Sequence, residues 1–273
     1  MIKNKSTQFN IGLVFSLAVI LMILAGLFLS PYGNTEMDAA MKFAGPSFKH
    51  IFGCDNFGRD IFTRATLGAT ISIGISLAAV VFGGLTGAVI GAMAGYFGGV
   101  FDEVVMRITD VLFSIPSLLL ALLFVSLSDS RIFNIILALS LSMVPSFVKM
   151  IRQEFKLQKE MDYVKAMKLY GAGDFRIIFV HIMPNVYKTL INCLFIAFNN
   201  CILAEAGLSF VGLGVQQPMA SLGKMLSEAN GFLLLSPHMS VFPGIFLILI
   251  LLGPGLISEG GSFYDAYRKR FKN

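Results

Sequence analysis

Residues 71–96 read ISIGISLAAVVFGGLTGAVIGAMAGY and form the middle of a run of 37 uncharged residues between Arg64 and Asp102. About 20 apolar residues are enough for a helix to cross the hydrocarbon core of a membrane. The run therefore predicts a long transmembrane helix, and it predicts an all-α fold for the chain if similar runs recur.

A row of glycines marks one face of this predicted helix. Gly83, Gly87, Gly91 and Gly95 recur at every fourth position, and residues four apart share one face of a helix. Small residues at that spacing let two membrane helices approach closely. We expect close helix packing along this face, either inside the subunit or at a sliding subunit interface beside a transport pathway.

The composition of the whole chain agrees with a membrane protein. Of its 273 residues, 56% are hydrophobic and 14% are charged, and its mean hydropathy is +0.77. Soluble domains carry roughly 25% charged residues. This composition excludes a disordered chain, a nucleic-acid-binding arm and most cytosolic enzymes, and it makes the lipid bilayer the expected surroundings.

Six charge-free intervals predict six transmembrane helices, because irregular backbone cannot face lipid. The intervals lie between Lys5 and Glu36, Arg64 and Asp102, Asp110 and Asp129, Arg131 and Lys149, Lys188 and Glu205, and Glu228 and Glu259. We interpret the first as a retained helix and not a signal peptide, since its apolar core at 11–29 is long and no Ala-x-Ala site follows.

The basic residues predict the orientation of these spans. An even number of spans places both termini on one side, and 15 of the 21 lysines and arginines fall on that side. Because basic residues concentrate in cytoplasmic loops, we expect both termini to be cytoplasmic. The expected regions are an N-terminal tail and first helix (1–30), an extracytoplasmic segment (31–69), a five-helix core (70–257) with a cytoplasmic loop (149–188) and an extracytoplasmic segment (206–238), and a basic cytoplasmic tail (258–273).

The cytoplasmic loop has helical periodicity. Residues 158–170 read QKEMDYVKAMKLY, with polar and apolar positions on two faces. Gly171 follows as a candidate helix C-cap, and Pro184 is expected to end a second helical stretch at 175–183. The loop suits either an amphipathic connector on the membrane surface or a docking element for a cytoplasmic partner.

Four blocks of sequence carry a family resemblance. The first, YVKAMKLYGAGDFRIIFVHIMPN (163–185), resembles the coupling loop of ABC-transporter permease subunits. Three other blocks resemble the dipeptide, oligopeptide and nickel permease family: FGCDNFGRDIFTRATLGATISI (52–73), GYFGGVFDEVVMRITDVLFSIPSLLLAL (95–122) and ILAEAGLSFVGLGVQQP (202–218). All four blocks occur in the order that is usual in the family. The chain resembles the second, shorter permease of a pair, with a type I importer fold.

Individual positions of the coupling loop match or depart from the family pattern. Ala166, Gly171 and Pro184 stand where the pattern has alanine, glycine and proline. Lys165 replaces the usual glutamate and Met167 replaces a second alanine. The bulkier methionine suggests a docking fit adapted to one particular ATPase.

The resemblance implies an ATP-driven importer in the inner membrane of a bacterium. An extracytoplasmic binding protein would deliver peptides, or alternatively nickel or metal chelates, to a heterodimer of two permeases. Two cytoplasmic ATPases would bind ATP and magnesium, while this chain would hold no cofactor or metal and would not be an enzyme. The resemblance assigns ATPase docking to six residues and loop termination to a seventh: Tyr163, Lys165, Ala166, Met167, Tyr170, Gly171 and Pro184.

Two other functional classes are weighed on the residues alone. A freestanding channel or proton-coupled carrier usually places ionisable residues in mid-span. An intramembrane protease needs a Ser/His, paired-Asp or HExxH set. The sequence has neither pattern, nor a phosphate-binding G-x-x-x-x-G-K-[ST] loop, which favours a permease.

Charges that border the spans are expected to form structural pairs near interfacial water. They are Arg59, Asp60, Asp110 and Glu205, with Arg107 as a helical partner of Asp110. Cys193 and Cys201 are expected to be small buried hydrophobes. The three histidines are too scattered to form a metal site.

Overall fold

The computed structural model describes residues 2–126 and 132–270; within these ranges it is mainly helical and has no β-strand, only an isolated bridge between Cys54 and Asp60. The helices are α1 (Ile2–Leu29), α2 (Ile61–Phe97), α3 (Gly99–Phe113), α4 (Ser117–Ser126), α5 (Ile132–Lys159), α6 (Asp162–Leu169), α7 (Asp174–Arg176), α8 (Met183–Val211), α9 (Leu222–Ala229) and α10 (His238–Arg270), with short turns η1 (Ala39–Met41), η2 (Ile177–Ile182) and η3 (Asn230–Phe232).

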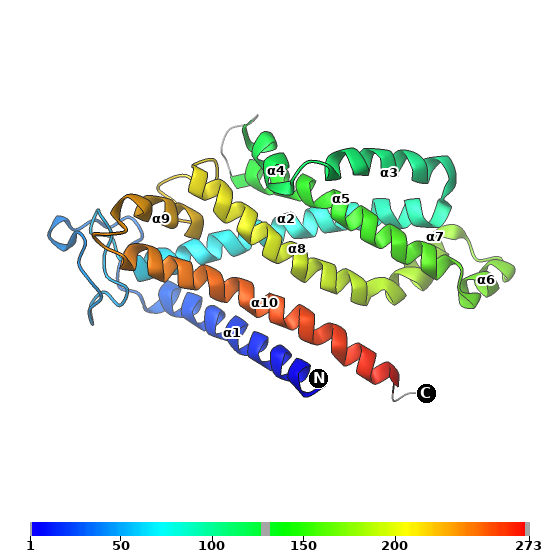
Figure 1. Cartoon of the computed structure of the whole chain (residues 1–273), viewed down its shortest axis with the longest axis horizontal. Helices are drawn as coiled ribbons and strands as arrows, with labels where there is room; N and C mark the ends of the chain where they lie inside the picture. The colour runs from blue at the N-terminus through cyan, green and yellow to red at the C-terminus, as the bar shows by residue number, and fades with distance from the viewer. Residues whose placement is uncertain (1, 127–131, 271–273) are drawn as a thin grey trace.

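The long helices lie side by side in an elongated bundle (Figure 1). The segment between α1 and α2 lies at one end of the bundle together with α9, while α6 lies at the opposite end. Both termini are directed toward the end that carries α6. The arrangement separates an outer end, built from 31–60 and α9, from an inner end, built around α6.

Five helical stretches are long and apolar enough to cross a membrane, and a bent helix pair makes a sixth if it is counted as one span. The five are Thr7–Leu29, Ile61–Phe97, Ile132–Lys159, Asp174–Val211 and His238–Gly260. They correspond to five of the six charge-free intervals.

The remaining interval, from Asp110 to Asp129, does not form the single helix that the sequence predicts. Instead α3 and α4 meet at a bend of 87°. Pro116 lies at the break, and the residue before a proline is disfavoured in the helical conformation. The boundary between the third and fourth charge-free intervals, at 129–131, lies outside the described residues, as do residues 271–273 of the predicted tail.

The glycine face of α2 packs against α5 within this subunit. A Cβ on Gly83 would lie 2.6 Å from the Ser140 carbonyl oxygen, and one on Gly91 would lie 2.7 Å from that of Val148. Gly87 and Gly95 approach α5 as closely. The four glycines, spaced four residues apart on α2, therefore face residues with the same spacing on α5. This face of α2 is therefore covered by α5 of the same subunit.

The prediction that Pro184 ends a helix is wrong. A continuous helical stretch runs from Asp174 to Val211, with Pro184 as the second residue of α8. The preceding turn, η2, is a π-helix, and the Met183 N–H reaches the Ile178 carbonyl five residues back. The π-turn shifts the hydrogen-bond register immediately before Pro184, so the missing N–H of the proline interrupts the ladder locally without ending the helix.

The outer segment is shorter than expected because α2 begins at Ile61. Asp60 caps the helix by accepting a hydrogen bond from the Thr63 N–H at 2.8 Å. Capping at this position stabilises a helix by about 1 kcal/mol. Nine residues of the expected segment, 61–69, therefore belong to α2.

Candidate functional site

The inner end presents α6 on a packed base. Val164 is fully buried, and Tyr163 and Met167 pack against an apolar cluster from α2, α5 and η2. The Tyr163 hydroxyl donates a hydrogen bond to Gln158 Oε1 at 2.9 Å, which ties α6 to the end of α5. Two of the six predicted docking residues thus face the subunit itself.

The end of α6 is a glycine cap, as the sequence predicts. Gly171 has a φ of +74°, a conformation that side chains with a Cβ rarely adopt. The Gly171 N–H bonds to the Lys168 carbonyl, and the Ala172 N–H bonds to the Met167 carbonyl, both at 3.0 Å. This pair of bonds is a Schellman motif, which turns the chain sharply toward α7.

The exposed surface of this end differs from the set that the resemblance implies. Lys165, Tyr170 and Gly171 are exposed and Ala166 is half-buried. Leu169 and Phe175, which the sequence reasoning missed, are 89% and 75% exposed. Their signal was present, since both are large apolar residues beside the glycine break of a charged loop. We define Leu169, Tyr170 and Phe175 as the inner apolar patch.

Tyr96 joins the inner end to α2. Its hydroxyl donates to Asp174 Oδ1 at 2.5 Å, and the Lys168 ammonium lies 5.1 Å from its ring centroid. A cation at that distance over an aromatic face is attracted to the ring. Tyr96 therefore holds both sides of the α6 to α7 turn against α2. Because it lies 78 positions before Asp174, no local sequence pattern indicates this role.

Ion pairs fasten α3 to α5 near the inner end. Asp102 accepts hydrogen bonds from Arg152 and lies 2.8 Å from the Lys156 ammonium. Asp110, about two turns further along α3, lies 2.7 Å from the Lys149 ammonium. These pairs span two helices, so they fix the position of α3 on the bundle.

The expected pairing of Arg107 with Asp110 is wrong. Arg107 instead bonds Glu103 Oε1 at 2.5 Å, on the exposed face of α3. The reason is tertiary: α5 brings Lys149 to Asp110 from a different helix, which no helical periodicity within α3 reveals.

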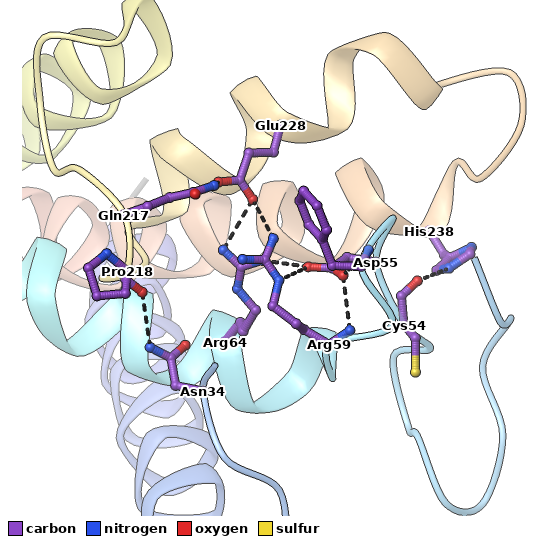
Figure 2. Close-up of polar contacts among 10 residues, drawn as sticks. Asn34, Cys54, Asp55, Arg59, Arg64, Gln217, Pro218, Glu228 and His238 are labelled. Atoms are coloured by element: carbon purple, nitrogen blue, oxygen red, sulfur yellow. Dashed lines mark hydrogen bonds and ion pairs between the residues drawn. The ribbon is translucent and has the colours of Figure 1, made fainter. Parts of the chain in front are cut away.

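The outer end contains a buried cluster of four charges (Figure 2). Asp55 Oδ2 accepts hydrogen bonds from Arg59 Nε at 2.6 Å and Arg64 Nη1 at 2.5 Å. Glu228 Oε2, on α9, accepts from both arginines at 3.1 Å, and Glu228 Oε1 accepts from Gln217 at 2.7 Å. We call Asp55, Arg59, Arg64 and Glu228 the outer ion cluster. It balances two positive and two negative charges and joins α9 to α2 and to the segment before it.

Asp60 is paired as expected, in a second polar group at the outer end. Its Oδ1 lies 2.9 Å from His50 Nδ1, and its Oδ2 accepts from the Thr63 hydroxyl at 2.8 Å. The ring of Tyr32 stacks on His50 with centroids 4.5 Å apart. These contacts connect the chain just after α1 to the start of α2.

Glu205 does not reach interfacial water, contrary to expectation, because it is fully buried on α8. The Ser209 hydroxyl donates to Glu205 Oε1 at 2.7 Å and accepts from the Val215 N–H at 3.1 Å. The carboxyl therefore positions the turn that leads from α8 back toward α9.

All three cysteines are free and buried, as predicted for Cys193 and Cys201. Burial, with the nearby charge of Asp60 as the next largest cause, raises the pKa of the Cys54 thiol from 9.0 to about 11. Across the described residues, no group of three or more histidine, cysteine, aspartate and glutamate side chains is arranged to hold a metal.

Comparison with known proteins identifies the family. A family model described as binding-protein-dependent transport system inner membrane component matches residues 87–272. The chain is 39% identical over 247 residues to the glutathione transport system permease protein GsiD of Salmonella typhimurium, covering 90% of this chain and 82% of that protein. With GsiD of Escherichia coli O157:H7 the identity is 35% over 255 residues, covering 92% and 84%.

A solved structure has the same fold. An inward-facing conformation of the MetNI methionine ABC transporter aligns with a TM-score of 0.56 and 18% identity, covering 70% of this chain and 93% of that chain. The protein is thus an all-α, multi-pass permease of the type I ABC importer fold in the bacterial inner membrane. The chain belongs to the family of binding-protein-dependent transport system inner membrane components.

Proposed function

We propose that this chain forms one half of the translocation pathway of an ATP-driven peptide importer. It pairs with a second permease in a heterodimer, with two cytoplasmic ATPases and an extracytoplasmic binding protein. ATP and magnesium are bound by the ATPases, and this chain is a non-catalytic subunit. Family membership supports this assignment over a freestanding channel or a secondary carrier.

The inner apolar patch carries the proposal. Leu169 and Tyr170 at the end of α6, with Phe175 across the glycine turn, expose apolar surface on a short helix with a buried base. Such a helix suits the groove of a partner protein, because burying this surface stabilises the complex. Lys165 and Gly171 contribute the exposed polar side and the turn. Tyr163 and Met167 act from within by supporting α6.

The proposed orientation places α6 and both termini in the cytoplasm. The excess of basic residues lies on that side of the spans, and Figure 1 places α6 and the termini toward the same end. The outer ion cluster and α9 then face the binding protein.

The proposed substrates are small peptides, with glutathione as the first to test. Two relatives are named as glutathione permeases. Nickel or a metal chelate is the alternative within the resembled family, and competition against peptide uptake separates the two.

The test uses the complete transporter in proteoliposomes, with its binding protein and labelled glutathione. Leu169→Asp places a charge in the patch, and we expect uptake to fall at least tenfold while the ATPases no longer copurify. Ala166→Asp should act in the same direction. Leu234→Asp, at an exposed leucine of the outer end, is the matched control and should leave copurification unchanged.

Three outcomes would count against the proposal. Normal uptake by Leu169→Asp at normal expression would remove the docking role. Uptake that needs no ATP would remove the importer assignment. Inhibition of labelled glutathione uptake by nickel chelates, but not by unlabelled peptides, would show that the substrates are metal chelates and not peptides.

A further inference from the structure

The exposed faces of the membrane helices differ in polarity. On α2, one exposed face carries Leu77, Phe82 and Leu85, and Phe82 also lines an apolar cavity of about 320 Å³ between α2 and α5. Thr86 is exposed among them, but its hydroxyl donates to the Phe82 carbonyl at 2.7 Å. This face has no unmet hydrogen bond in these side chains, so it can lie against lipid tails at no polar cost.

The groove between α5 and α8 is different because it exposes unpartnered polar groups. Asn200 on α8 and Ser146 on α5 are both exposed. Within the part of the chain that the structure describes, neither side chain has a hydrogen-bond partner. Moving an unpaired amide from water into hydrocarbon costs several kcal/mol. A lipid-facing position is therefore unfavourable for Asn200.

Asn200 lies deep in its span. It is 12 residues beyond Lys188 and 11 residues before Val211, which at 1.5 Å per residue is about 17 Å from either position. A span that ends at these two positions would place the amide far from either headgroup region, so Asn200 would need water or another polar surface at this depth.

Two cavities meet at Ser146. One of about 130 Å³ is lined by Ser146, Met150, Ile196 and Asn200. The other, of about 220 Å³, lies between Ser146 and the α3 to α4 bend at Pro116. Ser146 therefore lines both cavities, one beside α8 and the other beside the broken helix pair.

The middle of α5 adds a polar group of its own. Pro145 lies inside the helix and has no N–H to bond the Leu141 carbonyl four residues earlier. Ser146 follows at once and exposes its hydroxyl to both cavities. An acceptor and a hydroxyl are therefore available where a regular apolar helix would offer neither.

The chemistry of this groove suits an uncharged polar chain. Its polar groups are an amide and a hydroxyl, which both donate and accept, beside the soft side chain of Met150. Lys149, the nearest charge along α5, is paired with Asp110 at 2.7 Å. Peptide backbone amides match such neutral groups, whereas a bare metal ion finds no charged ligand there.

We propose that Ser146 and Asn200 line this subunit's wall of the translocation pathway and hydrogen-bond the backbone of a passing peptide. The inference rests on the proposed function as a peptide importer, and it adds where the substrate travels. The apolar face of α2 faces lipid, and the α5–α8 groove faces the aqueous path.

Cysteine accessibility in the complete transporter tests the placement. In a background with Cys54, Cys193 and Cys201 replaced by alanine, Asn200→Cys and Ser146→Cys are treated with a charged, water-soluble methanethiosulfonate. We expect both to react at least tenfold faster than Leu85→Cys, which is also at an exposed position, on the α2 face. Substrate-loaded binding protein with ATP should change the rate at Asn200→Cys and leave Leu85→Cys unaffected.

Two results would overturn the inference. Equal rates at all three positions would place the groove in lipid, and a cross-link of Asn200→Cys to the partner permease without reagent access would make it a subunit contact. Glutathione uptake is measured in the same vesicles. Uptake without labelling defeats the inference alone, whereas absent uptake in the parent with Asn200 intact defeats the proposed function.

A second variant tests the hydrogen bond itself. Asn200→Leu removes the amide without disfavouring a membrane helix, so insertion should be normal. We expect peptide uptake to fall about tenfold, while Asn200→Gln retains most of it. Unchanged uptake by Asn200→Leu would show that the amide does not serve the substrate.

Discussion

Arg64 and Glu228 are 164 positions apart in the sequence, yet Arg64 Nη2 donates a hydrogen bond to Glu228 Oε2 at 3.1 Å. The arginine side chain is 2% exposed and the glutamate 13%. This contact holds α9 against α2. It makes the position of the outer helix depend on a balanced set of buried charges.

Removing one charge from the outer ion cluster should destabilise the protein strongly. Arg64→Met leaves the two carboxylates of Asp55 and Glu228 with only one positive charge beside them, that of Arg59. Breaking a buried ion pair in this way costs about 3–5 kcal/mol. Thermal unfolding in detergent measures the loss. Glu103→Gln, in an exposed pair on α3, should change stability by less than about 0.5 kcal/mol. Equal effects of the two variants would refute the structural role of the cluster.

Side chains on the glycine face of α2 should separate α2 from α5. A Cβ at Gly91 would lie 2.7 Å from the Val148 carbonyl oxygen, and overpacking of this kind costs roughly 1–3 kcal/mol. Gly74→Ala, on the same helix, meets no atom within 4 Å and should be neutral or stabilising by up to about 1 kcal/mol. Unfolding in denaturant of Gly91→Ala and Gly74→Ala measures both, and a neutral Gly91→Ala would contradict the packing.

Loss of the Tyr96 hydroxyl should loosen the inner end. Tyr96→Phe removes the bond to Asp174 and keeps the ring beneath Lys168. We expect faster amide hydrogen exchange across α6 and a several-fold lower ratio of transported substrate to hydrolysed ATP. Tyr187→Phe, at an exposed tyrosine of α8, serves as the control. Unaltered exchange in α6 would mean that Tyr96 does not restrain it.

Cys54 should resist alkylation in the folded protein. Its pKa of about 11, against 9.0 for an ordinary thiol, lowers the thiolate fraction at pH 7.5 about 100-fold. Because the pKa is raised, the thiolate fraction reaches one half only at about pH 11. Mass spectrometry after maleimide treatment should show labelling of Cys54 only upon unfolding. Rapid labelling of the native protein would contradict its burial.

A reporter fused after Asn273 should be active only in the cytoplasm. The prediction follows from the distribution of lysines and arginines and from an even number of spans. A reporter fused after Gly45, in the outer segment, should be active only outside the cytoplasm, and it serves as the control within the same chain. Extracytoplasmic activity of the Asn273 fusion would exclude six spans with both termini in the cytoplasm.

Local sequence determines much of this fold. The charge-free intervals identify five membrane-spanning stretches, and the position of Gly171 identifies the end of α6. Both signals are local, since solvation by lipid and a positive φ each depend on only a few neighbouring residues. Pro116 is also a local signal for a helix break. The interval around it carries no charge, however, and therefore predicts one continuous helix.

Other features depend on tertiary contacts that no local pattern contains. Pro184 continues a helix because a π-turn precedes it, and Asp110 binds Lys149 because α5 approaches α3. Arg59 was recognised as a charge at a span border, but its acceptor on α9 lies 169 positions away. The exposure of Leu169 and Phe175 likewise follows from which side of α6 the apolar cluster occupies.

The uninterrupted helix from Asp174 to Val211 acts as a lever arm. Its 38 residues span about 57 Å, from the turn beside α6 to the outer end. By simple geometry, a tilt of about 10° around the inner end of a rod this long displaces the outer end by about 10 Å. A tilt of this size that started at the turn beside α6 would therefore move the turn that Glu205 and Ser209 hold at the other end of the helix.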